Sequence, residues 1–127
     1  MRAMSRAAFS LRVFACYLFV LGAGLVAVPQ LLLGVFGLVA TEVWIRVVGV
    51  LVFNIGVYYW AAAAGEARSV FVASVATRVL VFAAFGTFAL LGLVQPVLVI
   101  FGLADLAGGV WTALALRSVP HPAPVGA

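Results

Sequence analysis

Charge is what this sequence has least of. Its 127 residues include seven arginines, three acidic residues and no lysine, so charged side chains make up 8% of the chain and hydrophobic ones 68%. A soluble domain carries about a quarter charged residues, and a small one leaves much of its surface in water. The composition therefore excludes a soluble enzyme or nucleic-acid-binding domain, and the solvent that fits it is a lipid bilayer.

Cysteine and histidine are nearly absent too. Cys16 is the only cysteine, which excludes an intramolecular disulfide and the thiol–quinone oxidoreductases that need a cysteine pair. The only histidine, His121, lies in a proline-rich tail, so a His-based metal or haem site among the apolar segments is excluded as well. The arginines are spread along the chain rather than clustered. We therefore expect no metal, no cofactor and no nucleic-acid partner.

The apolar residues form stretches long enough to cross a bilayer, which takes about 20 helical residues. They predict an all-α fold, an integral membrane four-helix bundle in one domain over residues 1–117. Pro29 and Pro96 mark helix boundaries, and the expected spans are 8–28, 43–64, 69–94 and 97–116.

Two further segments are not expected to cross the membrane. Leu31–Ala40 is apolar but too short, so we expect a re-entrant or interfacial segment. Residues 118–127 contain three prolines and are expected to form a disordered tail.

The arginines predict the orientation in the membrane. Basic residues flank the start of the first span, the connection between the second and third spans, and the end of the fourth: Arg2, Arg6, Arg12, Arg68 and Arg117. The positive-inside rule then places both termini in the cytoplasm of a cell whose inner membrane holds the protein. A signal peptide ending near Ala27 is the alternative interpretation of the first apolar run.

Each expected span contributes a polar side chain near the middle of the bilayer. With a rise of about 1.5 Å per helical residue, Tyr17, Asn54, Arg78 and Asp105 all fall at similar depth. Ionisable groups at that depth are costly, usually face the bundle interior and are candidates for function. We therefore expect Arg78 and Asp105 to form an ion pair or share a water molecule.

This pair has two interpretations. It is either a structural contact that sets the register of the last two spans, or a binding and catalytic pair. In the second case Arg78 holds a polar group of a ligand, and Asp105 orients Arg78 or acts as acid and base. Asn54, Tyr58, Tyr17 and Phe82 are then the expected ligand-binding residues, while Tyr59 and Trp60 are assigned to an aromatic belt at the interface.

The last span also carries small residues at helical spacing. Ala104, Gly108 and Thr112 form one such row, and Asp105, Gly109 and Ala113 form another. Rows of this kind allow close helix contact. The contact is either with the third span or with a second copy of the chain, which makes a homo-oligomer through this span a possible partner arrangement.

A set of short motifs resembles small bacterial four-span proteins of the DoxX-like type and related families. Pro29 ends the first span, Phe36-Gly37-Leu38 follows it, and Arg46-Val47-Val48-Gly49 opens the second span. Tyr58-Tyr59 then lies near the end of that span. The resemblance covers about residues 8–116 and implies a four-helix membrane bundle. Its members are loosely associated with quinone-linked, redox or stress roles, but no matched residue carries such a role.

Three functions remain open from the sequence. The first is binding of a small lipophilic molecule, such as a quinone or isoprenoid, at the midplane cluster, with proton-transfer chemistry if the protein is an enzyme. The second is a non-enzymatic accessory or scaffold subunit of a membrane complex. The third is a dimeric transporter.

Overall fold

A computed structural model describes residues 3–39 and 43–118 of the chain, and these are helical for most of their length. The helices are α1 (Arg6–Ala27), α2 (Pro29–Gly34), α3 (Trp44–Ala64), α4 (Arg68–Leu90), the 3-10 turn η1 (Pro96–Leu98) and α5 (Val99–Arg117). Four helical segments are long and apolar enough to cross a membrane: Arg6–Ala27, Trp44–Ala64, Arg68–Leu90 and Pro96–Arg117. The prediction of four apolar helices is confirmed. Arg2 and the expected tail after Ser118 lie outside the described residues.

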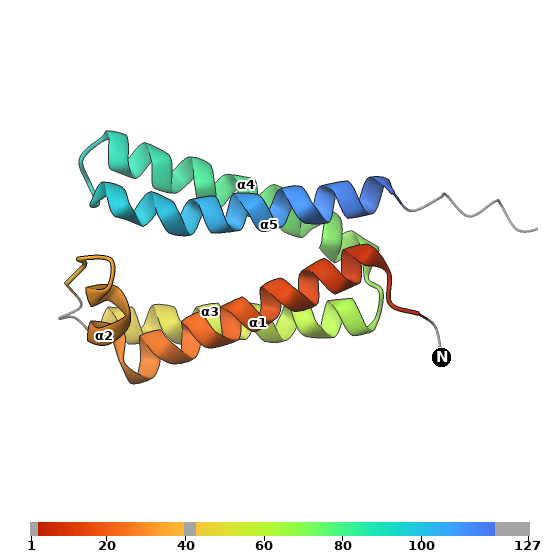
Figure 1. Cartoon of the computed structure of the whole chain (residues 1–127), viewed down its shortest axis with the longest axis horizontal. Coiled ribbons are helices and arrows are strands. Elements are labelled where there is room, and N and C mark those ends of the chain that lie inside the picture. The colour runs from red at the N-terminus through yellow and green to blue at the C-terminus, as the bar shows by residue number, and fades with distance from the viewer. Residues whose placement is uncertain (1–2, 40–42, 119–127) are drawn as a thin grey trace, which may run out of the picture.

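The four long helices form two antiparallel hairpins. Helix α1 packs along α3, and α4 packs along α5, while the hairpins meet mainly where α1 contacts α5. Figure 1 shows the hairpins converging at the end where α1 begins and separating toward α2. At the converging end Ser5 caps α1 by accepting from Ala8 N (3.0 Å), and its hydroxyl donates to Glu66 Oε2 (2.6 Å) in the α3–α4 connection.

Glycines bring α1 and α3 into unusually close contact. A Cβ added at Gly22 would lie 2.7 Å from the Gly49 carbonyl oxygen, and one added at Gly49 would lie 2.8 Å from that of Gly22. Gly56 lies one heptad farther along α3 and is covered by Phe19. Because these glycines must face α1, they fix how α3 is rotated about its own axis.

The third long helix ends earlier than the sequence predicted, and a short helix follows the first one. The third span was expected to reach Val94, but α4 ends at Leu90 because Gly92 adopts φ +72° and turns the chain. The expected re-entrant or interfacial segment contains the short helix α2, whose Leu33 is buried with Leu25 of α1. Gly37, at φ +71°, then turns the chain toward α3.

The α1–α3 contact can be tested at Gly49. We expect Gly49→Ala to lower the free energy of unfolding by about 1–3 kcal/mol, since the new methyl group has no space in a packed contact. Gly86→Ala in α4 is the matched control, because an added Cβ there meets nothing within 4 Å. Thermal unfolding in detergent, followed by circular dichroism, measures both. Equal stability of the two variants would contradict the close α1–α3 contact.

Candidate functional site

A cavity of about 490 Å³ lies between the two hairpins. Its volume is in the range of sites that hold small organic molecules. Along α1 it extends from Phe14 to Leu25, about 16 Å of helix. The polar side chains that line it are Tyr17, Tyr59, Thr77, Arg78 and Asp105.

The remaining walls of the cavity are apolar, and they extend from the polar group toward α2. They consist of Phe14, Leu18, Leu21, Leu25, Leu33, Leu38, Val39, Ile45, Val48, Val52, Ile55, Val81, Phe85, Leu98 and Phe101. Phe36 and Phe101 pack with ring centroids 4.9 Å apart near this apolar end. The cavity therefore has a polar end near the middle of the helices and an apolar arm.

Arg78 is the most buried charged side chain in the described part of the chain. It is the eleventh of the 23 residues of α4 and is 1% exposed. Its Cζ lies 4.0 Å from the ring centroid of Phe14 and 5.0 Å from that of Tyr59. Aromatic rings from α1 and α3 therefore pack against the guanidinium of α4. Each of these cation–π contacts contributes about 0.5–2 kcal/mol.

A hydroxyl network holds one edge of this guanidinium. Arg78 Nη1 donates to Thr112 Oγ1 at 3.1 Å, and Thr112 Oγ1 lies 2.8 Å from Ser10 Oγ. Ser10 and Thr112 are buried. The network therefore links α4 to α5 and α1 through groups that water does not reach.

The other edge of the guanidinium is free. Nε and Nη2 of Arg78 are buried and have no hydrogen-bond partner among the residues that the structure describes. A buried donor without a partner costs about 1–3 kcal/mol, and more when it is charged. Nε and Nη2 are two donors of the planar guanidinium fork, and such a fork can bind two oxygen atoms of one acceptor group.

The expected direct ion pair between Arg78 and Asp105 is not formed. Nη1 is directed to Thr112, which lies seven residues, or about 10 Å, farther along α5 than Asp105. Asp105 instead lines the cavity as a half-buried side chain. The two charges therefore face one cavity without touching, which differs from a structural ion pair.

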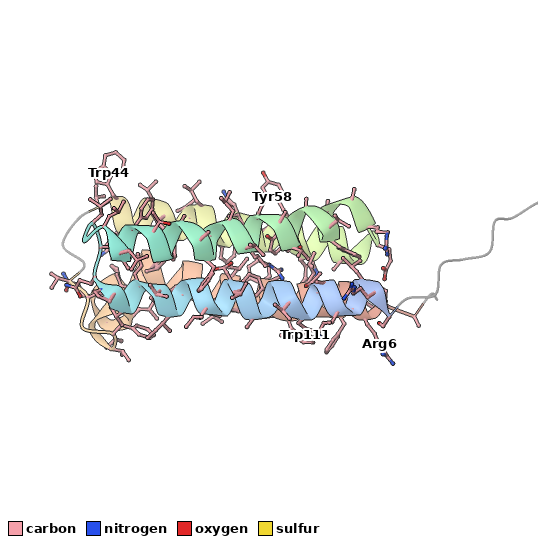
Figure 2. The ribbon with its side chains drawn as sticks, turned by 90° about the horizontal axis from the view of Figure 1, so that it is seen from above. Arg6, Trp44, Tyr58 and Trp111 are labelled. Atoms are coloured by element: carbon pink, nitrogen blue, oxygen red, sulfur yellow. The ribbon has the colours of Figure 1, made fainter. Side chains whose placement is uncertain are left out.

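The cavity includes some of the predicted ligand-binding residues but not others. Tyr17 lines it, and its ring packs 5.3 Å from that of Phe14. Asn54 and Tyr58, which were predicted to bind a ligand, do not line the cavity: both are exposed, Tyr58 by 70%. Figure 2 shows Tyr58 pointing away from the bundle.

The rotation of α3 about its own axis explains why Asn54 and Tyr58 lie outside the cavity. With Gly49 and Gly56 turned toward α1, the cavity face of α3 comprises Ile45, Val48, Val52, Ile55 and Tyr59. Tyr59 is therefore the tyrosine of α3 that lines the cavity, although it was assigned to the aromatic belt. The seven-residue spacing of the two glycines was the signal in the sequence that could have identified the correct face.

Phe82 is also outside the cavity. Its backbone packs on α5, where a Cβ added at Gly102 would lie 3.3 Å from Phe82 Cα. Phe85, about one turn farther along α4, lines the cavity instead.

The small residues of α5 make contacts within the chain. A Cβ added at Gly108 would lie 2.8 Å from the Phe14 ring, and one added at Gly109 would lie 3.3 Å from Arg78 Cβ. Thr112, in the same row as Gly108, is fully buried. These rows therefore bring α5 against α1 and α4, and this face of α5 is already covered.

Comparisons with protein-family models, with curated proteins and with solved structures find no match to this chain. Within residues 3–39 and 43–118, no group of three or more histidine, cysteine or acidic side chains could hold a metal ion. The arrangement offers hydrogen-bond donors from Arg78 and hydroxyl groups from Tyr17, Tyr59 and Thr77. It also offers one carboxyl group, that of Asp105, beside a long apolar wall.

The Thr112 network gives a stability prediction. We expect Thr112→Val, which keeps the shape but removes the hydroxyl, to lower the free energy of unfolding by about 1–3 kcal/mol because Arg78 loses its acceptor. Thr87→Val is the control, since the exposed Thr87 hydroxyl bonds only Ala83 O of its own helix. Chemical unfolding in detergent micelles compares them. A Thr112→Val protein as stable as the Thr87→Val protein would show that the bond to Arg78 contributes nothing.

Proposed function

We propose that this chain is an inner-membrane protein that crosses the bilayer four times and binds a small lipophilic molecule in the cavity between its hairpins. The observation that carries the proposal is Arg78: a buried guanidinium with two unpartnered donors at the polar end of an otherwise apolar cavity. A ligand with an oxygen acceptor would satisfy those donors when the Arg78 side chain turns toward it, since both atoms are covered here, and its apolar part would occupy the arm toward α2.

The outer surface of the bundle supports insertion in a bilayer. Large apolar side chains on all four long helices are exposed, among them Val20, Leu51, Leu80 and Leu114. Such a surface is suited to lipid rather than water. The antiparallel order of the helices brings the Arg6, Arg68 and Arg117 ends together at the converging end of the bundle (Figure 1). By the positive-inside rule this end, with both termini, would face the cytoplasm.

The chemistry of the site favours a ligand with a carbonyl or an acidic oxygen head. Arg78 would hold that head, while the hydroxyls of Tyr17 and Tyr59 would donate further hydrogen bonds. Asp105 is the only carboxyl group among the lining residues and would be the group that exchanges a proton with the ligand if a reaction takes place. A quinone or an isoprenoid with an oxygen function has the required shape and polarity.

A structural role for Arg78 in a scaffold subunit is the second candidate. It is favoured by the Ser10–Thr112–Arg78 network, which joins three helices whether or not a ligand is bound. The two roles differ in what they require of Tyr17 and Asp105. A scaffold needs neither group, whereas a binding site needs the polar end of the cavity.

The two neighbouring tyrosines of α3 provide the test. We expect Tyr59→Leu and Arg78→Gln to weaken binding of a short-chain benzoquinone by roughly tenfold to a hundredfold, the effect of losing a charged or buried hydrogen bond. Tyr58→Leu is the matched control and should bind as the wild type does, because Tyr58 faces away from the cavity. Quenching of tryptophan fluorescence by the quinone in nanodiscs measures the affinity.

A second measurement covers ligands other than quinones. Mass spectrometry of organic extracts of the purified protein should find a lipophilic molecule with the wild type and the Tyr58→Leu protein, and less of it with Asp105→Asn. Folded Arg78→Gln and Asp105→Asn proteins that retain the same molecules and bind quinone equally would refute the binding function.

We propose that a ligand enters the cavity sideways, between α3 and α4. Val48, Ile55 and Thr77 line the cavity and are also exposed, and α3 contacts α4 only sparsely. We expect Ile55→Trp to slow quinone association at least several-fold by narrowing this opening. Ile100→Trp, on an exposed part of α5 that does not line the cavity, should not change it. Stopped-flow quenching gives both rates, and equal rates would place the entrance elsewhere.

A further inference from the structure

The outer face of α3 carries an amide at the middle of the helix. Asn54 is the eleventh of the 21 residues of α3, so about 15 Å of helix lies on either side of it. Its side chain is exposed and makes no hydrogen bond within the part of the chain that the structure describes. In a four-span arrangement this amide faces the centre of the hydrocarbon layer.

An amide in that position needs a partner. Transfer of an amide from water to a medium without hydrogen-bonding groups costs about 4–8 kcal/mol, and polar side chains in membrane helices bond across helix–helix contacts. Thr87 shows the alternative, a bond within the same helix, which Asn54 does not make. The Thr87 side chain is exposed on α4, but its hydroxyl donates to the Ala83 carbonyl at 2.8 Å in its own helix.

The residues around Asn54 form a continuous stripe. Spacings of four and three residues connect the exposed positions Val47, Leu51, Asn54, Tyr58 and Ala61. This is the spacing of the seam in a left-handed pair of helices. This stripe is distinguished by a single amide at its centre, with the apolar residues Val47 and Leu51 preceding it along α3. A lone asparagine in a seam of this kind specifies register and partner number in parallel helix pairs.

We propose that the α3 stripe (Val47, Leu51, Asn54, Tyr58 and Ala61) is the contact surface for a second copy of this chain, related by a two-fold axis along the membrane normal. Copies inserted in the same orientation place their α3 helices parallel and Asn54 at equal depth. On a two-fold axis a residue meets its own counterpart. The carboxamide suits this contact because it has two donors and an acceptor, and is therefore complementary to itself.

A different helix was expected to make the contact with a second copy. The small-residue rows of α5 are covered within the chain by Phe14 and Arg78. The α3 stripe is free of such contacts. The proposal rests on the four-span orientation but not on the ligand, because none of the stripe residues lines the cavity.

Cysteine cross-linking in native membranes tests the stripe. In a Cys16→Ser background, which removes the exposed native thiol, Leu51→Cys keeps Asn54 intact and places one thiol on the stripe. We expect oxidation to give a disulfide-linked dimer of this chain with Leu51→Cys. Leu80→Cys is the matched control: Leu80 is a similarly exposed leucine, 66% against 57%, but lies on α4, and it should give none.

The role of the amide is then tested by adding Asn54→Leu to the Leu51→Cys protein. We expect the association constant of the dimer to fall roughly threefold to thirtyfold. Asn54→Gln should retain part of the dimer affinity. Neither change should alter the unfolding temperature of the monomer in detergent. Four outcomes would overturn the proposal: cross-linking from Leu80→Cys instead, cross-linking to another protein, no cross-linked dimer, or a dimer insensitive to Asn54→Leu. If the wild-type protein forms the dimer but binds no quinone, only the proposed function is refuted.

Discussion

The burial of one guanidinium constrains the rest of this structure. Arg78 lies at the centre of α4, and its side chain is surrounded by a residue from each of the other long helices: Phe14, Tyr59 and Thr112. In the proposed membrane orientation Arg78 lies at the centre of the bilayer, where a charged side chain costs about 2.5–3.5 kcal/mol on insertion scales. The cation–π contacts and the bond to Thr112 offset part of this cost, so the four helices are arranged around this group.

The packing of the two hairpins explains why a cavity lies beside Arg78. Glycines pack α1 tightly on α3 and α5 tightly on α4, whereas the two hairpins are joined mainly through α1 and α5. The space between α3 and α4 stays open, and Arg78, Tyr59 and Asp105 lie on its walls. The separation of Arg78 from Asp105 across an open volume favours a ligand over a purely structural pair.

The sequence was sufficient to predict the four helices, because their length and apolar composition decide that question. It did not reveal how α3 is rotated. Apolar side chains lie on every face of this helix, so the periodicity of its side chains indicates no buried face. The contact of Gly22 with Gly49 decides the rotation, and it depends on backbone atoms of two helices. For that reason Asn54 and Tyr58 were expected at the cavity and Tyr59 was not, whereas Tyr17, Arg78 and Asp105 were expected there and do line it.

The contacts around the Arg78 side chain have a consequence for how the two hairpins assemble. The three residues around it, Phe14, Tyr59 and Thr112, come from both hairpins, so neither hairpin alone can cover the guanidinium. The α4–α5 hairpin by itself supplies only the Thr112 contact and leaves the guanidinium without its two aromatic neighbours. Chain order supplies the α1–α3 hairpin first during synthesis. A chain whose first hairpin fails to fold would thus leave the charge of Arg78 without the rings of Phe14 and Tyr59, and the assembled bundle covers it only when both hairpins are in place.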